Sequence, residues 1–430
     1  MIFLRNIIEN LYLIDQLNSE IRSIAFKFVI IKSFSVFILN LSSIFLILYF
    51  IDQFGYTTSG ILMGILVFVQ FITDYPSGSL SDLLGQKWVY LIAFSLFSLS
   101  YGILFFQNEL IFIIFSCILL GLALGQESGT LQSWFDNNYR NLTKEDDLES
   151  RKQYGHFIGR ERSISRFIMA ISFLSGALLS NLYYRTIVFF LQGILSIIML
   201  IFAFIIISPK EKDTDLNSWD KLFFLRGIHN ILNDRDLFFL VLGTSFIVAG
   251  SKVFHELLLY PMYFGYSGTD FYAGLIRSII FFLTIPVGFF VAKASTKVDD
   301  SSLFKLSFIM IIFFYLPFIP LLVFIPLENT INIIAIIFLV ISLALFVTFS
   351  SEIFEIVKQR VLVVKVQTQN RNAIYSFIPS LAALISVPLL PICGIIIDMF
   401  GLYAACMLLF FIGLIGVIFL KKSSNLKKIL

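Results

Sequence analysis

The stretch of sequence that decides the fold reads Gly78-Ser79-Leu80-Ser81-Asp82-Leu83-Leu84-Gly85-Gln86-Lys87. It places a carboxylate, a glycine and a cation between two long apolar segments, Gln53 to Thr73 and Trp88 to Asn108. Glycine adopts the backbone conformations of tight turns more easily than any other residue. We therefore predict a tight turn here between two membrane-spanning helices, with its charges at the membrane surface.

The composition of the 430-residue chain is that of a membrane protein. Hydrophobic residues make up 58% of it and charged residues 14%, whereas soluble domains are about 45 to 50% apolar and about 25% charged. A helix needs about 20 residues to cross the hydrocarbon core, and apolar runs of that length recur along the whole chain. One longer run, 237–293, is divided into two by Pro261 and by the glycines from Gly265 to Gly268. The sequence thus predicts twelve spans, at Ser33–Ile51, Gln53–Thr73, Trp88–Asn108, Leu110–Gln126, Phe167–Tyr184, Thr186–Pro209, two within 237–293, Leu306–Leu327, Asn329–Ser351, Asn372–Ile397 and Met399–Leu420.

The basic residues predict the orientation of the chain. With twelve alternating spans, nearly all of the 31 Lys and Arg residues fall on the side of both termini, and Arg185 falls on the other side. Basic residues are enriched in cytoplasmic loops. We therefore expect a multi-pass protein of the plasma (inner) membrane whose N- and C-termini are both cytoplasmic.

The polar segment from Lys210 to Asp236 separates the expected spans into six and six. We predict a cytoplasmic or interfacial N-terminus (1–22), a first six-helix bundle (23–208), a linker with an amphipathic helix (209–236), a second six-helix bundle (237–421) and a basic cytoplasmic tail (422–430). A weak repeat relates the two halves, because Pro76-Ser77-Gly78 and Pro286-Val287-Gly288 both end an even-numbered span. The predicted fold class is an all-α polytopic membrane protein with two pseudo-symmetric halves.

The stretch from Gly78 to Lys87 resembles the signature of the major facilitator superfamily, a Gly-x-Leu-x-Asp-x-x-Gly-Arg-Lys-like loop between the second and third spans, with Gln86 in place of the usual arginine. Two further stretches resemble bacterial, drug-efflux-like branches of this superfamily. They are Ser128-Gly129-Thr130-Leu131-Gln132-Ser133-Trp134-Phe135-Asp136-Asn137, and Arg371-Asn372-Ala373-Ile374-Tyr375-Ser376 leading to Gly394-Ile395-Ile396-Ile397-Asp398. The resemblance covers nearly the whole chain and implies a secondary transporter that works by alternating access.

The resemblance also implies a cytoplasmic gate. In the family the loop aspartate, here Asp82, docks on the cytoplasmic end of the eleventh span and holds the inner side closed. A helix N-terminus stabilises a carboxylate, and a helix beginning near Asn372 would supply one. Lys87 can reach lipid phosphate or Asp136. The expected gate residues are Asp74, Gly78, Asp82, Gly85, Lys87, Asp136 and Arg371; the alternative is a capped loop whose charges mark the membrane surface.

Ionisable residues at membrane depth cost about 2.5 to 3.5 kcal/mol each on insertion scales, so each one is a candidate for function. Lys252, His255 and Glu256 lie at i, i+3 and i+4, which places them on one face of the seventh span. Arg277 enters at a similar depth from the eighth span. We predict a substrate or proton-coupling site here. The alternative is a self-neutralised cluster that holds the second half together, with His255 as a hydrogen-bonded packing residue.

Glu127 lies among Gly121, Gly125, Gln126 and Ser128, on a span that lines the central cavity in the superfamily. A carboxyl group in a site of low dielectric can take up and release a proton. We predict that Glu127 couples transport to protons; the alternative is a structural hydrogen bond. Asn40, near the middle of the first span, is a second candidate for substrate binding.

Several function classes lack the residues that would carry them. The chain has no phosphate-cradling glycine loop, metal-spaced His and Cys cluster or nucleophile elbow, and Cys117, Cys393 and Cys406 all fall inside apolar spans. We expect no cofactor, metal, enzymatic activity or nucleic-acid partner. The predicted function is proton-coupled export of an amphipathic or hydrophobic small molecule by a monomer in the lipid bilayer. The alternatives are uptake of a nutrient or metabolite by proton symport and, more remotely, a membrane enzyme or sensor.

Overall fold

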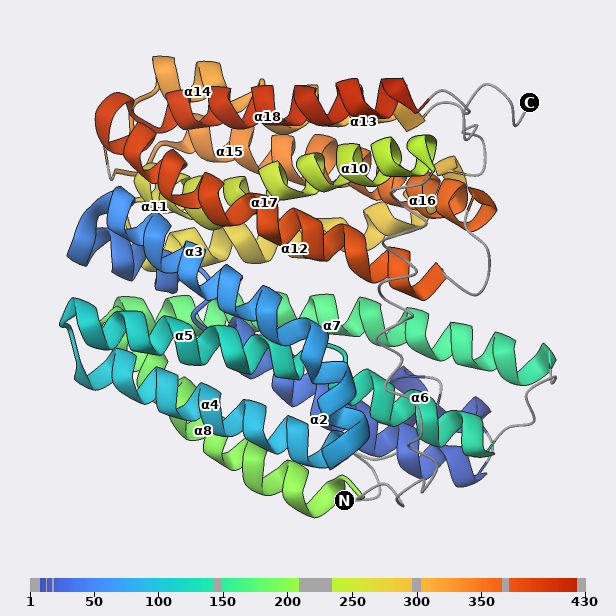
Figure 1. Cartoon of the computed structure of the whole chain (residues 1–430). Coiled ribbons are helices and arrows are strands. Elements are labelled where there is room, and N and C mark those ends of the chain that lie inside the picture. Colours follow the sequence, from blue (N-terminus) through green and yellow to red (C-terminus); the bar gives the residue numbers. More distant parts are fainter. Residues whose placement is uncertain are drawn as a thin grey trace. The chain divides into compact units, whose positions relative to one another are not determined.

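The structure is a computed structural model that describes residues 8–12, 14–17, 19–142, 148–208, 234–295, 303–328, 330–365 and 371–423, and the regular elements among them are helices (Figure 1). The helices form two compact units, residues 1–43 with 69–212 and residues 44–68 with 213–430. Most of the expected linker, with its amphipathic helix, and the end of the basic tail lie outside the described residues.

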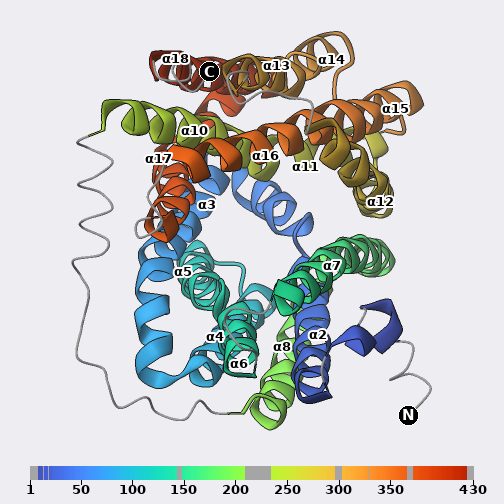
Figure 2. The ribbon, with the colours of Figure 1, turned by 90° about the vertical axis from the view of Figure 1, so that its right-hand side faces the viewer.

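The first unit is a bundle of long helices. They are η1 (Ile14–Gln16), α2 (Ser19–Asn40), the second part of α3 (Phe45–Leu84), α4 (Gln86–Phe106), α5 (Leu110–Glu127), α6 (Thr130–Leu142), α7 (Leu148–Leu182) and α8 (Arg185–Ile206). α4 packs along α5 and α8, and α2 lies beside α7 (Figure 2). The connections between successive helices are short, and α5 folds back along α4 as α8 does along α7.

The second unit contains more irregular helices. They are the first part of α3, α10 (Arg235–Val253), the π segment η2 (Phe254–Leu259), α11 (Tyr260–Ser267), α12 (Asp270–Ser295), α13 (Leu303–Tyr315), α14 (Phe318–Phe324), α15 (Ile333–Ile341), the π segment η4 (Ser342–Val347), α16 (Thr348–Lys365), α17 (Arg371–Phe400) and α18 (Leu402–Lys422). α10 packs along α17 and α18. Proline lies inside α12 and at three positions of α17, where it removes a backbone hydrogen bond.

The first two expected spans break at positions other than those predicted. The first helix, α2, begins at Ser19, well before the predicted Ser33, and a turn at 41–44 interrupts the expected span. The predicted boundary at Asp52 is also wrong, because the helix continues to Gly55, which has φ 74 and ψ 175. That backbone conformation suits glycine and strains other residues, so α3 consists of two helical stretches, 45–54 and 56–84.

Nine helices among the described residues are long and apolar enough to cross a membrane. One of them, Ile21–Asp74, contains both of the first two expected spans. The helix α12 and the run from α15 to α16 occupy the two expected positions that these nine do not cover. The structure therefore agrees with a multi-pass membrane protein, while the count of twelve and the cytoplasmic termini stay predictions.

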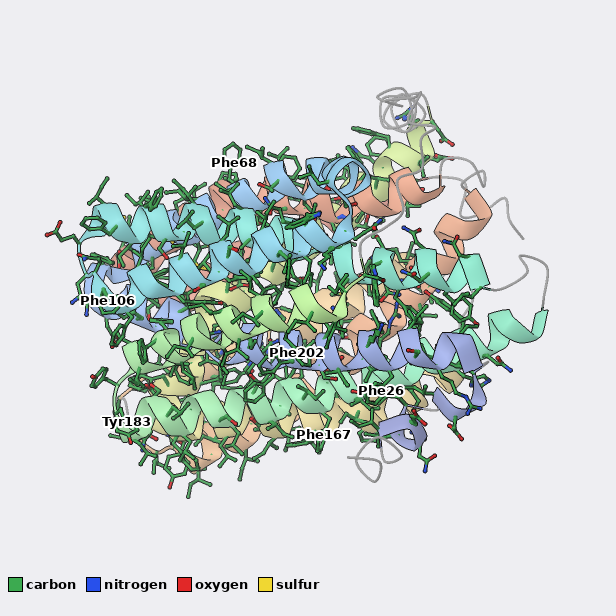
Figure 3. All side chains as sticks on the ribbon, turned by 90° about the horizontal axis from the view of Figure 1, so that it is seen from below. Phe26, Phe68, Phe106, Phe167, Tyr183 and Phe202 are labelled. Carbon is green, nitrogen blue, oxygen red and sulfur yellow. The ribbon has the colours of Figure 1, made fainter. Side chains whose placement is uncertain are left out.

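Apolar side chains cover the outside of the helices as well as their interior. Phe106 is 72% exposed and Tyr183 is 66% exposed, and both lie toward one end of the first unit's helices (Figure 3). Phe167, also exposed, lies farther along the same unit. Exposed apolar area on this scale fits a protein whose surroundings are lipid.

Candidate functional site

The turn predicted from the opening stretch is a single residue. Gly85 has φ 87 and separates α3 from α4, which begins at Gln86. Gln86 occupies the position at which the superfamily has an arginine, and its side chain is buried, as is that of Ser81. The predicted turn is confirmed. Gly78 and Asp82 belong to the last turns of α3, and the side chains of Asp82 and Arg371 lie outside the described part of the structure.

Two other expected gate residues have neighbours that the sequence did not suggest. The Nζ atom of Lys87 lies 4.5 Å from the centroid of the Phe204 ring of α8. Asp136 of α6 accepts hydrogen bonds from the Tyr154 hydroxyl group at 2.7 Å and from Gln132 Nε2 at 2.9 Å. Asp136 therefore joins α6 to α7, and Lys87 packs against α8.

Glu127 is the last residue of α5, next to a close helix crossing. A Cβ atom on Gly125 would lie 2.9 Å from the backbone nitrogen of Asp74, so α5 touches α3 with its backbone here. Glu127 itself is partly exposed, and Gly129, with φ 70, separates it from α6. Its carboxyl group interacts electrostatically with the buried hydroxyl group of Tyr90 on α4. Glu127 thus lies at a helix junction, between interior and surface.

Asn40 ends α2 and uses its side chain within its own helix. The Nδ2 atom of Asn40 donates to the carbonyl oxygen of Val36 at 2.8 Å. The backbone carbonyl oxygen of Asn40 accepts a hydrogen bond from Ser43 Oγ at 3.3 Å. These contacts shape the end of α2 where the turn at 41–44 begins. A role in substrate binding stays a prediction.

The second unit brings the predicted charged residues together. Lys252 lies in the last turn of α10, Glu256 lies in η2, and Arg277 lies in the second turn of α12. Glu256 interacts electrostatically with both Lys252 and Arg277. His255 donates from Nδ1 to the carbonyl oxygen of Ser251 at 2.8 Å, which is the packing role that the sequence left open as an alternative.

Aromatic rings surround the cationic part of this cluster. The guanidinium carbon of Arg277 lies 4.6 Å from the centroid of the Tyr260 ring and 5.2 Å from that of Phe281. Arg277 also interacts with the hydroxyl group of Tyr263. Planar guanidinium groups stack on aromatic faces, which holds the charge in a fixed orientation away from bulk water. The site therefore combines oriented positive charge, one carboxylate and flat apolar surfaces.

Sequence reasoning missed the π segment that carries His255 and Glu256. A π segment inserts an extra residue into an α-helix and turns the following side chains to a new face, and such segments are frequent at functional sites. It ends immediately before Tyr260 and Pro261. Pro261 was the available signal, because a proline inside a helix leaves a carbonyl group one turn earlier without its usual partner. The predicted split is confirmed at Gly268, with φ 73, whereas the helix runs through Pro261.

Comparison with known proteins identifies the class. The sequence model of the Major Facilitator Superfamily matches residues 28–357. The fold resembles that of a mutant of the nucleoside transporter NupG, with a TM-score of 0.74, 13% identity, and coverage of 93% of this chain and 100% of that one. It also resembles an auto inhibited POT family peptide transporter (TM-score 0.69, 10% identity, 95% and 97% covered) and the POT family transporter PepTSo (0.69, 11%, 95% and 98%). No curated protein sequence matches the chain.

The chain belongs to the major facilitator superfamily, since the family match covers more than half of its length. It is an all-helical, multi-pass membrane protein with the fold of a secondary transporter. At identities of 10 to 13%, the likeness to the solved transporters concerns the fold alone.

Proposed function

We propose that the chain is a proton-coupled secondary transporter that exports an amphipathic or hydrophobic small molecule by alternating access. The observation that carries the proposal is the charged cluster of Lys252, Glu256 and Arg277 inside the helices of the second unit. Retaining ionised groups at membrane depth costs several kcal/mol, about 2.5 to 3.5 for each group on insertion scales. In a transporter the binding of cargo offsets that cost, because such groups bind a charged cargo that lipid would exclude.

The chemistry of the cluster indicates the cargo. Within the cluster Lys252 and Arg277 are cationic and Glu256 is anionic; Asp270 lies in the first turn of α12. Two positive charges and one negative charge favour an anionic group on the cargo. The rings of Tyr260 and Phe281 beside Arg277 favour a flat apolar body. A small amphipathic molecule with one acidic group meets both requirements.

We assign proton coupling to Glu127, whose carboxyl group ends α5 beside the buried hydroxyl group of Tyr90. Uptake and release of one proton there would change the charge of the helix junction between α5 and α6. The same proposal includes a monomeric protein in the inner membrane with both termini in the cytoplasm. It also includes a gate formed by Asp74, Gly78, Asp82, Gly85, Lys87, Asp136 and Arg371.

Uptake by proton symport is the second candidate, and the charged cluster supports it as well. A polar nutrient or metabolite with an acidic group would satisfy Lys252 and Arg277 as well as an exported compound does. The solved structures of similar fold include transporters named for nucleosides and for peptides. The direction of transport decides between the two candidates.

Purified protein in sealed vesicles with an imposed pH gradient tests the proposal. A panel of small aromatic acids, neutral analogues of the same acids and nucleosides is offered on either side of the membrane. We expect gradient-driven movement of an aromatic acid against its concentration gradient, opposite to the direction of proton flow. Movement with the proton flow establishes symport instead. Equal movement of acids and neutral analogues contradicts the assignment of the charged cluster.

A further inference from the structure

The first turns of α7 separate their charges by helix face. Between residues 153 and 182 the helix has one acidic residue, Glu161, which is buried and accepts a hydrogen bond from Ser165 Oγ at 2.7 Å. Arg160 and Arg162, on either side of it in sequence, are both exposed. Within the part of the chain that the structure describes, neither arginine forms an ion pair. The outward face of α7 therefore carries positive charge that the buried carboxylate does not neutralise.

These arginines lie just outside the length of α7 that crosses lipid. The candidate span Gln153–Leu182 has 30 residues, whereas about 20 are needed to cross the hydrocarbon core. Exposed Tyr183 follows it directly, and tyrosine is enriched at membrane surfaces. Counting about 20 residues back from the end of the span reaches Ser163. Arg160 and Arg162 therefore lie within about 5 Å of the hydrocarbon boundary, at the level of the lipid headgroups.

The helix surface between the two arginines is open. Around the axis of an α-helix, Gly159 falls between Arg160 and Arg162. A Cβ atom added to Gly159, or to Gly155 one turn away, would meet no atom within 4 Å. A long side chain on a helix covers the turn before its own residue, so Arg162 reaches over the side of Gly159. The surface here is bare backbone with a guanidinium group on each flank.

The same face of α7 continues along the lipid. Phe167, Ile171 and Leu178 follow Arg160 at i+7, i+11 and i+18, which places all four on one side of the helix. The three apolar side chains are each between 39% and 47% exposed, and Phe167 lies on the outside of the first unit in Figure 3. A lipid chain packed along these residues would have its headgroup beside Arg160.

We propose that Arg160, Arg162 and the bare backbone at Gly159 bind the headgroup of an anionic phospholipid, and we call these three residues the headgroup site. Guanidinium groups form paired, charge-assisted hydrogen bonds with phosphate oxygens, and basic residues beside a membrane attract anionic lipids. The acyl chain of the lipid lies along Phe167 and Ile171. The predicted orientation places the site in the cytoplasmic leaflet. The headgroup site requires neither the proposed cargo nor proton coupling.

Quenching by brominated lipids measures occupation of the headgroup site. Phe167→Trp, in a background whose three native tryptophans are replaced by phenylalanine, places an indole beside the bound acyl chain. Mixtures of phosphatidylglycerol and phosphatidylcholine, with either lipid brominated, give the relative affinity of the two lipids there. We expect a preference for phosphatidylglycerol that falls about fivefold in Arg160→Gln or Arg162→Gln and about 25-fold in the double variant. The reporter Tyr183→Trp, at the other end of the span, should show no such fall.

An unchanged preference in the double glutamine variant would overturn the headgroup site. An equal fall at the Tyr183→Trp reporter would overturn it as well. The control for charge is Lys421→Gln with Lys422→Gln, two exposed cations at the end of α18. An equal fall in that control would reduce the effect to the total charge of the protein and overturn the site.

A lysine variant separates charge from the stability of the fold. Arg160→Lys with Arg162→Lys keeps both charges and should retain part of the preference, since an ammonium group binds phosphate without the paired geometry. Thermal unfolding in phosphatidylcholine alone should be the same for the parent and both double variants. Loss of the preference in the lysine variant to the level of the glutamine variant would overturn the role of charge.

Gly159→Leu tests whether the site has a defined shape. Leucine favours the helix more than glycine does, but its side chain fills the space between the two arginines. We expect the preference to fall about as much as on removal of one arginine. Gly155→Leu, one turn farther from the membrane, is the matched control and should leave the preference unchanged. Equal preferences in the parent and the Gly159→Leu variant would indicate diffuse attraction and overturn the site.

A soluble phosphate compound is the other source of the same chemistry. Glycerol phosphate, which is part of the phosphatidylglycerol headgroup, is added to protein held in phosphatidylcholine alone. It should shift the thermal unfolding of the parent no more than that of the double glutamine variant. Stabilisation of the parent alone would overturn the assignment to lipid.

Discussion

The two units differ in how closely the backbones of their most extensively packed helix pairs approach, whereas elsewhere both units contain close glycine contacts, such as that of Gly125 in the first. In the second unit α10 and α18 meet at Gly243 and Gly416, where a Cβ on either glycine would lie 2.7 Å from the carbonyl oxygen of the other. In the first unit α4 and α8 meet at Gly193, where the nearest atoms would lie 3.7 Å from an added Cβ. The first distance excludes a methyl group, whereas the second is ordinary van der Waals contact.

Polar groups show the same contrast. In the first unit, neutral groups join α4 to α5, through the hydroxyl groups of Ser100 and Ser116 at 2.6 Å, and α8 to α2, through Gln192 Nε2 donating to the carbonyl oxygen of Ile38 at 2.6 Å. Inside the second unit Lys252, Glu256 and Arg277 gather around a π segment. Under the proposed function, the cargo binds among the irregular helices of the second unit, and the first unit contributes Glu127 at the junction of α5 and α6.

The glycine contacts give the largest expected effect. Gly243→Ala forces α10 and α18 apart and should lower the free energy of unfolding by about 3 kcal/mol, because overpacking against backbone cannot be relieved by a side-chain rotation. The matched change Gly193→Ala should alter it by less than about 0.5 kcal/mol. Thermal unfolding of the detergent-purified variants measures both. Equal losses would remove the contrast between these two helix pairs.

Arg277→Ala removes the oriented charge of the cluster and should lower the rate of cargo transport about 100-fold, which corresponds to about 2.7 kcal/mol of lost binding or transition-state stabilisation. Arg277→Lys should recover only part of the rate, since an ammonium group does not stack on Tyr260 and Phe281 as a guanidinium does. Arg235→Ala is the control, because Arg235 also lies over a ring, that of Phe239, but at the start of α10. A similar loss in the control would contradict a special role for the cluster.

Glu127→Gln should reduce gradient-driven transport about tenfold and leave exchange of cargo at equal pH unchanged, because the amide keeps the shape of the carboxyl group but holds no exchangeable charge. Initial rates with and without a pH gradient measure the two activities. Glu109→Gln, an exposed carboxylate at the turn between α4 and α5, should change neither. Intact dependence on the gradient in the Glu127 variant would show that protons act elsewhere, and that the first unit is a scaffold only.

Ser116→Ala should have the smallest effect. It removes one partner of the hydroxyl pair with Ser100, and such bonds between membrane helices contribute about 0.6 kcal/mol on average. We expect a small fall in unfolding temperature with normal transport. A loss of transport without a loss of stability would assign this pair a function and weaken the distinction between the units.

The sequence predicted features that depend on local chemistry. A glycine between two apolar runs predicts the turn at Gly85, and the structure places φ 87 there. The spacing of Lys252 and Glu256 places them on one helix face, the depth of Arg277 in the next span places it near them, and Glu256 does interact with both. Hydropathy also indicated the number of long apolar segments well enough to reveal a polytopic protein.

Features that depend on packing between distant segments were not predictable in the same way. Hydropathy placed the first break at the charge of Asp52, whereas the helix breaks at the only nearby residue that tolerates its conformation, Gly55. The bond between Thr57 and Asp398 joins segments 341 residues apart, and no local pattern specifies that pairing. The spacing of Gly60 and Gly64 was a signal for close helix contact, although it does not identify the partner.

The helical stretch 56–84 also has a mechanical consequence, because it crosses from one compact unit to the other between Phe68 and Val69. From Gly64, held against α17, to Leu84, the stretch acts as a lever arm of about 30 Å. A tilt of about 5° around Gly64 would displace its far end by about 2.6 Å, at the rise of about 1.5 Å per residue that sets its length. Only Gly85 separates the end of this arm from α4, so the displaced end is also the point where α4 begins.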